Sequence, residues 1–537
     1  MHPCLCISEI LELICQEFSQ DPDLLWNINN GKALVSLACT SRSWSEPALQ
    51  VLWYRVQGID KLFRSLAKDL WEKFNDEDPL VLKRPLSTSD MRIFDKNAAR
   101  IRVFVERNDQ NVTLYRALYA RGYSCVLPRL EALSWQIEIP DLFPYLRLLI
   151  PPSLRKLDAF FGDQSLVIEQ LNLLGAIPLT FPLGITNLSL GTEKDYPDTI
   201  FPGCDSARKA FVDVLRSWSN VTDLELDEVP LESLGCIVNM PSLKQLVFRT
   251  ESDPVDPPHR EPDFGPLPWK GKPEPPCPFL QAITISQTPV STIHVMFKAL
   301  VHLQLRYLSL GLGRTKNNTL SGTEALLDEL NRLIDPHTLE DISISSRFGF
   351  QRSSLVAPLL RFRKLKKVRL DAYPLDFTSD IPMSEVASSW PLLESMYIVS
   401  STSANPETSR NLLSLIPLAK ECQQLHTLFF RLNASDPAVW RIIQDNPNVT
   451  EGVQNWSLKR LQIQQSPISD SKLVVSFLSK LFPALERVDW TSYGREVVES
   501  HQRRWERVDR MLGKMKRERE LRTPRDSTRG WRMLSSG

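Results

Sequence analysis

A short apolar pattern recurs along most of this chain and limits what the chain can fold into. The pattern is an apolar residue, two variable residues, an apolar residue, one variable residue and a final apolar residue. Its thirteen copies begin at residues 130, 154, 185, 221, 243, 280, 305, 339, 365, 393, 425, 458 and 485. The mean spacing of about 30 residues falls in the range of repeat architectures, in which each unit buries its apolar side against its neighbours.

Prolines and the intervals between the copies indicate what each repeat contains. In six copies a proline lies two residues before the first apolar residue, at Pro128, Pro152, Pro241, Pro278, Pro391 and Pro483. Proline cannot continue a helix, and it favours extended backbone in the residue before it. Helical periodicity fills several intervals, including 206–218, 323–334, 409–422 and 470–482. The repeating unit is therefore predicted to be helix, proline and strand, which gives an α/β fold.

The leucine-rich copies resemble an irregular leucine-rich-repeat solenoid. That resemblance implies parallel strands on the inner, concave side and helices outside. The asparagine that the family places after the last apolar residue is present only as Asn433, so a less regular solenoid is expected. Variable positions on the strands are expected to face the concave surface. Five such positions are Glu225, Ser309, Ser343, Arg369 and Gln462.

The first residues of the chain predict a small helical unit. Apolar residues in 7–18 recur at helical spacing, and a second short helix can carry Leu34 and Leu37. A third helix, with Leu49, Leu52 and Trp53, is expected to begin with Ser45 as its N-cap and Pro47 close behind it. Three helices this short cannot bury all of their apolar surface among themselves. Something else must therefore cover part of it.

This helical unit resembles the F-box family. The matching residues are Glu9, Ile10, Ile14, Leu37, Cys39, Arg42, Trp44, Leu52 and Trp53, and the Glu-Pro-Ala-Leu after Ser45 is similar to fungal members with a repeat domain behind the F-box. Ile7 stands near the place of the family's early proline, and residues 21–30 look like an insertion.

The F-box resemblance implies docking to a Skp-type adaptor, and through it to the cullin of a ubiquitin ligase. The residues expected to contact the adaptor are Ile10, Ile14, Leu37, Trp44, Leu49, Leu52 and Trp53. The repeats would then hold a protein target, which makes the chain a non-catalytic substrate-recognition adaptor. Three alternatives stay open. The helices are a plain cap on the next domain, the chain is a structural scaffold whose F-box-like unit is vestigial, or, least favoured, it is an unrecognised hydrolase built on the concave face.

Composition narrows the classes of partner and compartment. Lys plus Arg and Asp plus Glu both number 64, so there is no chain-wide basic charge for nucleic acid and we expect no such partner. No stretch approaches the ~20 apolar residues of a membrane span, and Glu9 and Glu12 interrupt the first apolar run as a signal peptide would not. Nine cysteines without a C-x-x-C pair fit free thiols in the cytoplasm or nucleus. No catalytic motif, metal-ligand spacing or cofactor-binding sequence is present, so we expect no enzyme.

The remaining segments complete the expected domain organisation. It comprises an F-box-like domain (1–57), a helix and linker (58–89), repeats (90–494) with a proline-rich insertion (250–278), and a basic helical tail (495–537). The helix of the linker is expected at 60–71, and 100–105 is expected to be a strand with one solvated face. In the tail, an apolar stripe comprises Val498, His501, Trp505, Val508, Leu512 and Met515. It is compatible with a cap on the last repeat, with a partner-binding helix, or with use of the basic face for nucleic acid.

Overall fold

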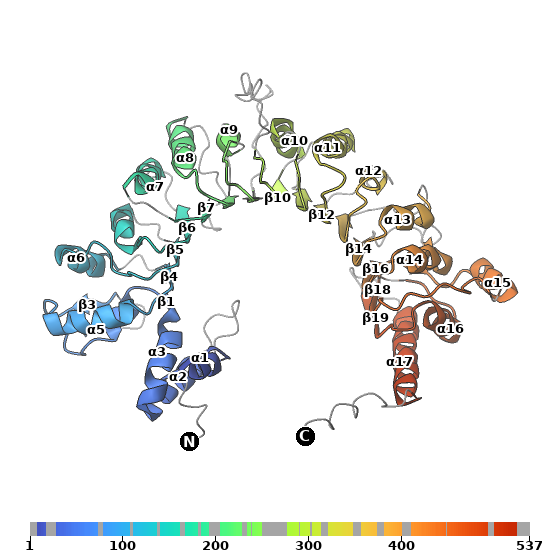
Figure 1. Cartoon of the computed structure of the whole chain (residues 1–537), viewed down its shortest axis with the longest axis horizontal. Coiled ribbons are helices and arrows are strands. Elements are labelled where there is room, and N and C mark those ends of the chain that lie inside the picture. The colour runs from blue at the N-terminus through green and yellow to red at the C-terminus, as the bar shows by residue number, and fades with distance from the viewer. Residues whose placement is uncertain are drawn as a thin grey trace, which may run out of the picture. The chain divides into compact units, whose positions relative to one another are not determined.

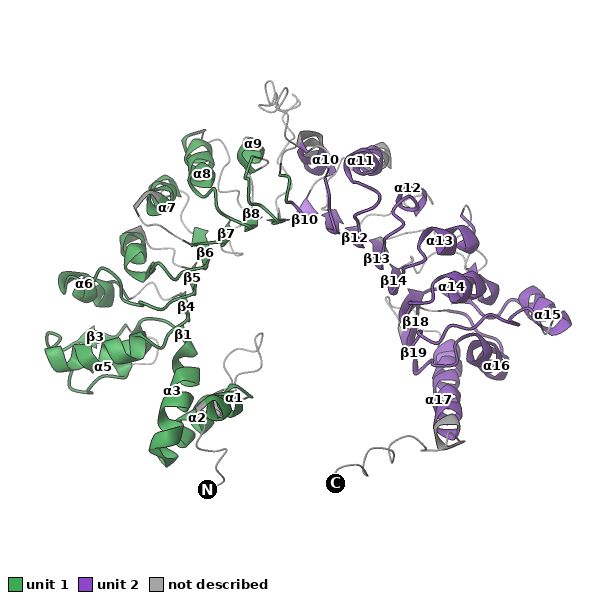
Figure 2. Ribbon diagram, viewed as in Figure 1, with its two compact units in different colours: residues 1–252, 256–279 green, residues 253–255, 280–537 purple. Residues whose placement is uncertain are grey.

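The computed structural model describes most of the chain, in two compact units. The described residues are 8–17, 28–73, 79–107, 111–136, 140–161, 167–180, 184–192, 205–227, 233–237, 239–249, 277–288, 290–300, 303–312, 320–346, 356–372, 381–399, 410–446, 448–464, 466–491 and 499–522. Residues 18–27 and 250–276, which hold most of the two expected insertions, lie outside them. Unit 1 comprises residues 1–252 and 256–279, and unit 2 comprises 253–255 and 280–537 (Figure 2).

Unit 1 begins with helices and continues as a parallel sheet. Its helices are α1 (Ser8–Glu17), α2 (Ile28–Thr40), α3 (Arg42–Tyr54), α4 (Asp60–Arg64), α5 (Thr88–Ala98), α6 (Val112–Ala120), the 3-10 helix η3 (Pro140–Leu149), α7 (Val167–Thr180), α8 (Asp205–Ser217) and α9 (Leu234–Ile237). Its parallel strands, in spatial order, are β1 (Arg55–Gln57), β4 (Val103–Glu106), β5 (Ala132–Gln136), β6 (Lys156–Phe161), β7 (Asn187–Thr192), β8 (Asp223–Asp227) and β9 (Gln245–Arg249). A short antiparallel pair, β2 (Trp71–Glu72) and β3 (Val81–Leu82), lies between α4 and α5 in the sequence.

Unit 2 repeats the same arrangement. Its helices are α10 (Val290–Ala299), α11 (Leu320–Leu333), α12 (Val356–Leu359), α13 (Met383–Ser389), the 3-10 helix η7 (Leu412–Ser414), α14 (Leu415–Glu421), α15 (Pro437–Asp445), α16 (Ser471–Leu481) and α17 (Glu499–Arg522). Its parallel strands, in spatial order, are β10 (Ala282–Thr288), β11 (Tyr307–Leu312), β12 (Asp341–Ser346), β13 (Lys367–Ala372), β14 (Ser395–Val399), β16 (Thr427–Phe430), β18 (Arg460–Gln464) and β19 (Arg487–Thr491). A small parallel pair joins β15 (Arg410–Asn411) to β17 (Leu432–Asn433). Within each unit, the helices between the strands lie on one side of the sheet (Figure 1).

The predicted α/β fold class, a leucine-rich-repeat-like array of parallel strands, is confirmed. Each of the thirteen copies forms a strand that begins two residues after the copy's first apolar residue. That first residue is at most 3% exposed in every copy, from Leu130 at 0% to Leu485 at 3%. The second and third apolar residues are buried too, except Trp490 in the last strand, which is half-buried. The pattern therefore marks the side chains that face the helices.

Neighbouring repeats are joined by a recurring pair of backbone hydrogen bonds. The carbonyl of the second residue in a copy accepts two successive N–H groups of the next copy. The Glu131 carbonyl accepts from Arg155 at 2.8 Å and Lys156 at 3.0 Å, and the Glu340 carbonyl accepts from Lys366 at 2.7 Å and Lys367 at 3.1 Å. These bonds fix the register in which each strand pairs with the next.

Several sequence expectations need correction. The N-cap of α3 is Ser41 and not Ser45: the Ser41 hydroxyl accepts from the Trp44 N–H, and the Ser45 N–H donates to the Ser41 carbonyl. Ser41 can cap because its backbone is extended, with φ −159° and ψ 162°. The helix expected at 60–71 ends at Arg64, because Trp71 pairs with Leu82 in the β2–β3 hairpin.

Two strands at the start of the sheet were missed or misjudged. The strand β1 follows α3 directly and was not predicted, because its three residues carry no copy of the pattern. The strand β4 was expected to have a solvated face. Instead Phe104, Val105 and Glu106 are all buried, and the Glu106 carboxylate accepts hydrogen bonds from the Ile59 N–H, the Asn111 amide and the Tyr115 hydroxyl. A buried carboxylate is tolerated where donors surround it.

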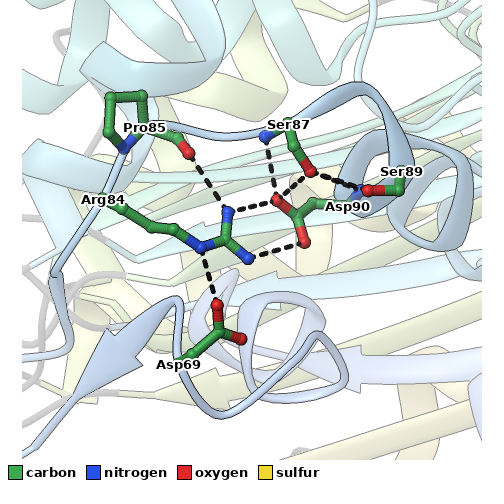
Figure 3. Close-up of polar contacts among 6 residues, drawn as sticks. All are labelled: Asp69, Arg84, Pro85, Ser87, Ser89 and Asp90. Carbon is green, nitrogen blue, oxygen red and sulfur yellow. Dashed lines mark hydrogen bonds and ion pairs between the residues drawn. The ribbon is translucent and has the colours of Figure 1, made fainter.

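A buried carboxylate also organises the segment between β2 and α5. Asp90 receives a bidentate pair from the Arg84 guanidinium, at 2.6 and 3.2 Å, and a 2.8 Å hydrogen bond from the Ser87 N–H (Figure 3). Ser87 caps α5 and accepts from the Asp90 N–H, so the two residues form a capping box. The Arg84 side chain also donates to exposed Asp69 at 2.8 Å. The Arg84 and Ser87 hydrogen bonds hold the pKa of the Asp90 carboxyl well below its ordinary value.

We predict that Asp90→Asn lowers the free energy of unfolding by about 1.5–3 kcal/mol at neutral pH, because charge-assisted hydrogen bonds are lost. The folded-state pKa of Asp90 is depressed, so its stabilisation is present above the ordinary carboxyl pKa of about 4 and is lost as the pH falls below it. Urea unfolding at neutral and acidic pH measures the difference, which should shrink in acid. Asp69→Asn is the control, because Asp69 is exposed; an equal cost for both variants would contradict the assignment.

Candidate adaptor-docking and target-binding surfaces

The first candidate surface is on α1, α2 and α3, where both α1 and α2 pack against α3. One residue from each helix, namely Cys15, Leu34 and Ala48, forms a buried cluster with at most 3% exposure. Partly buried apolar residues pack against this cluster, among them Leu37, Trp44 and Leu52. The three helices therefore have a core of their own, built partly from residues that the F-box resemblance assigns to the adaptor.

The seven residues predicted to contact the adaptor divide into two sets. Leu37, Trp44 and Leu52 pack against the buried cluster. Ile10, Leu49 and Trp53 are half-buried, and Ile14 is 36% exposed. Substitutions in the first set would disturb the helical core as well as any partner contact, so they cannot separate folding from binding.

The helical unit also exposes apolar residues that the sequence pattern does not mark, two of which are on α1 and α2. Leu13 on α1 is 62% exposed and Val35 on α2 is 49% exposed. Helical periodicity selects residues that lie on one stripe, and in α1 that stripe contains the buried Leu11. Leu13 lies off this stripe. An apolar residue at a position where the helical pattern predicts a polar one is the sequence signal for such an exposed side chain.

The helical unit is anchored to the first strands without an intervening linker. Helix α3 ends at Tyr54 and β1 begins at Arg55, which pairs with Val103 of β4 (Figure 1). Beside this junction the Arg100 side chain, only 6% exposed, donates to both carboxylate oxygens of Glu46, at 2.9 and 2.6 Å. The hydrogen bond from Arg100 lowers the pKa of Glu46. The backbone and this ion pair hold α3 against the start of the sheet.

Replacing Glu46 with Gln should lower the free energy of unfolding by about 1–3 kcal/mol, because it leaves the buried Arg100 without its carboxylate. Chemical denaturation measures this change, and hydrogen exchange should report faster opening of α3. Glu72→Gln is the matched control, because the Glu72–Lys83 pair is exposed on both sides and should contribute no more than about 1 kcal/mol. Equal effects of the two variants would show that the Glu46–Arg100 pair does not anchor the helix.

The second candidate surface is the side of each sheet that faces away from the helices, which we call the open face. Most side chains of the variable strand positions lie there, half-buried or exposed, between buried neighbours; Phe429 is an exception, at 1% exposure. All five predicted positions, Glu225, Ser309, Ser343, Arg369 and Gln462, are of this kind. In unit 2, four of them fall in one row across the strands, in which Ser309 pairs with Ser343, Ser343 with Arg369, Arg369 with Tyr397, Tyr397 with Phe429, and Phe429 with Gln462.

An aromatic stack lies in the middle of this row in unit 2. The rings of Tyr397 and Phe429 are stacked with centroids 4.2 Å apart. The Arg369 guanidinium lies 4.5 Å from the centroid of the Tyr397 ring, within cation–π range. The sequence pattern marks neither aromatic residue, because the adjacency of Arg369, Tyr397 and Phe429 depends on the register of three separate repeats. Phe429 is buried, at 1% exposure, whereas Tyr397 is half-buried and Arg369 is exposed. The accessible part of the stack is therefore Arg369 and Tyr397, and arginine and tyrosine are both enriched at protein interfaces.

The open face of unit 1 has a different chemistry. A hollow of about 140 Å³ is lined by polar residues of β6, β7, β8 and β9, including Lys156, Asp158 and Glu225. Lys156 lies 3.2 Å from Asp158, and Arg249 lies 2.7 Å from Glu225. Burial, aided by the nearby Glu225 charge, raises the pKa of Asp158 although Lys156 opposes the shift. This face is polar and charged, in contrast to the stack in unit 2.

Other kinds of site lack support among the described residues. No group of three or more His, Cys, Asp or Glu side chains in them could hold a metal ion. Burial raises the pKa of the Cys277 and Cys422 thiols to about 12, which disfavours the reactive thiolate. Among these same residues, no helix combines the length and apolar character needed to span a membrane.

Comparison with known proteins adds little beyond the fold. No family model matches the chain, and no curated protein matches it. A chain in the crystal structure of the yeast Rad7 and Elc1 complex resembles this one with a TM-score of 0.33 and 10% sequence identity, over 92% of this chain and 91% of that chain. A likeness this weak carries no argument about function, so the proposals below depend on this chain's own residues.

Proposed function

We propose that this chain is a non-catalytic substrate-recognition adaptor of a ubiquitin ligase. In this proposal α1, α2 and α3 bind a Skp-type adaptor, which connects the chain to a cullin, and the open faces of the sheets hold a protein target. Tethering raises the target's effective concentration near the ligase, so the chain needs no covalent chemistry of its own. The proposed cytoplasmic or nuclear location follows from this role.

The observation that carries the proposal is the exposed apolar surface of the helical unit. Leu13, Ile14 and Val35 expose 62, 36 and 49% of their surface, on two helices that carry residues of the F-box-like pattern. Burial of apolar surface is a main source of affinity at protein interfaces. We therefore add Leu13 and Val35 to the seven residues predicted to contact the adaptor. Ile14 is already one of those seven.

The junction between α3 and β1 supports the same role. A target held on the open face would keep a defined position relative to the adaptor only if the helices and the first strands move together. The direct passage from Tyr54 to Arg55 and the Glu46–Arg100 pair provide such a connection. Glu46 belongs to the Glu-Pro-Ala-Leu segment of the F-box resemblance, so this segment has a structural role in the proposal.

One observation favours the scaffold alternative. Leu37, Trp44 and Leu52 pack against the buried cluster of the helical unit itself, so part of the expected docking surface is already covered. In a scaffold with a vestigial F-box-like unit, this internal packing would be the whole purpose of these residues. The two hypotheses differ in whether the exposed residues Leu13, Ile14 and Val35 bind anything.

Binding of the full chain to a purified Skp-type adaptor tests the proposal. The variant is Ile14→Asp with Val35→Asp, because both side chains are exposed and the buried cluster is left intact. With an interface loss of about 2 kcal/mol at each position, affinity should fall about 10³-fold. Size-exclusion chromatography and isothermal titration calorimetry measure the complex, and circular dichroism verifies that the variant is folded.

Ile93→Asp is the matched control, because Ile93 is an equally exposed apolar residue, at 48%, on α5 outside the helical unit. It should leave adaptor binding unchanged. No complex with the unmodified chain would overturn the ligase role and favour the scaffold. Two other outcomes would show that the adaptor does not use this surface. In one, the Ile14 and Val35 double variant still binds; in the other, the Ile93 control loses binding equally.

A further inference from the structure

The C-terminal helix α17 uses one side to cover the last strand of unit 2. Trp505, Val508 and Leu512 are buried, and the Trp505 indole donates to the Ser466 carbonyl at 2.8 Å. The Asp509 carboxylate accepts a 2.8 Å hydrogen bond from the Val488 N–H of β19. This side of α17 is therefore a cap, as the first of the three hypotheses for the tail expected.

The opposite side of α17 carries a stripe of cations. Spacings of four, three, four and three residues place five basic residues along one line of the helix: Arg503, Arg507, Arg510, Lys514 and Arg517. All five are exposed. At 1.5 Å per residue the stripe extends over roughly 21 Å. We call these five residues the basic stripe.

Most of the basic stripe has no anionic partner among the residues that the structure describes. Arg503 pairs with Glu499 at 2.7 Å, where both side chains are about three-quarters exposed. Arg510 donates to the Glu506 backbone carbonyl, at 3.3 Å, and forms no ion pair with a described residue. For Arg507, Lys514 and Arg517 the part of the chain that the structure describes supplies no carboxylate within salt-bridge distance. The capping side packs α17 against the last repeat, so the helix backbone that carries these charges is already ordered. Binding a ligand therefore costs little further backbone entropy.

The chemistry of the basic stripe favours one class of ligand. A protein partner would need apolar or aromatic anchors at the centre of its contact, since interface cores are depleted of charge. No large apolar residue on the described part of α17 is exposed. A phosphodiester backbone needs only a line of cations, because displaced counterions supply the free energy. The charge of the whole chain is balanced, so it gives no sign of the excess of positive charge on α17. That excess is local: residues 499–522 contain nine Lys and Arg against five Asp and Glu.

We propose that the basic stripe of α17 binds the phosphate backbone of nucleic acid without reading its sequence. Arg507, Arg510, Lys514 and Arg517 are the phosphate-contacting residues. This inference goes beyond the proposed ligase role and does not depend on it. Four contacts predict that the logarithm of the association constant falls with the logarithm of salt concentration with a slope of about −3.6 for duplex DNA.

The test is fluorescence anisotropy of labelled nucleic acid with the full chain, over about 50–200 mM salt. The probes are a random-sequence DNA duplex and a single-stranded RNA, both longer than the stripe. In the variant Arg507→Gln, Lys514→Gln, Arg517→Gln, affinity at the lowest salt should fall at least about tenfold and the slope should approach −1. These side chains are exposed, so thermal unfolding should be unchanged.

Two further variants make the result specific. Arg363→Gln, Lys364→Gln, Arg441→Gln removes three exposed cations elsewhere in unit 2 and should leave binding unchanged. Glu506→Gln removes the exposed acid that lies beside Arg503 and Arg510 on the helix, and it should tighten binding severalfold. An acidic peptide, polyglutamate, and vesicles containing phosphatidylserine serve as competing probes.

Three outcomes would overturn the proposal. The first is absence of binding to either nucleic acid at the lowest salt. The second is an equal loss in the two triple variants, which would show a general charge effect and no local site. The third is binding of polyglutamate or of the anionic vesicles, without binding of either nucleic acid. If the stripe variant also loses that binding, the stripe belongs to another class of partner.

Discussion

Pairing of each strand with the next is the constraint on which the rest of this structure depends. A single repeat has one strand and at most a few turns of helix, so it cannot satisfy its own backbone or bury its own apolar side. The carbonyl of the second residue in each copy, as at Glu131 or Glu340, takes two N–H groups from the following repeat. The side chains at these positions add alternating charges: the Glu340 carboxylate accepts from both Arg306 and Lys366, on the two neighbouring repeats. Stability in such an array is a sum of contacts between neighbours.

The same constraint explains the two ends of the chain. A terminal strand has unpaired backbone groups on one side, and native proteins cover such edges. At the end of unit 2, α17 does this with Asp509 and Trp505. At the start of unit 1, α3 passes directly into β1 and the Glu46–Arg100 pair secures it. The helices at both ends therefore have a structural role. Both ends also present a surface to solvent, with apolar residues of α1 and α2 at the N-terminus and cations of α17 at the C-terminus.

The proposed functions use surfaces that the repeats do not need for their own stability. Apolar residues at fixed positions of each copy are committed to the interior, which leaves the alternate positions free to vary. That freedom explains why the open face is polar with acidic residues in unit 1, whereas unit 2 has the Arg369–Tyr397–Phe429 stack. The variable positions carry polar, charged and aromatic side chains, but no rule repeats from one copy to the next. The proposed docking surface likewise includes Leu13 and Val35, which lie outside any periodic pattern.

The sequence by itself determined the repeat and its register. Periodic apolar residues and prolines are local signals, so all thirteen strand starts and the helices at 206–218, 323–334 and 470–482 could be predicted closely. The tertiary structure alone decided which residues meet. In the folded chain the N-cap of α3 is Ser41 and Glu106 of β4 is buried. Leu37, Trp44 and Leu52 are partly buried against the core of the helical unit. These outcomes depend on contacts between residues far apart in the chain, such as Glu46 with Arg100 or Tyr397 with Phe429, and periodicity within a short segment contains no information about them.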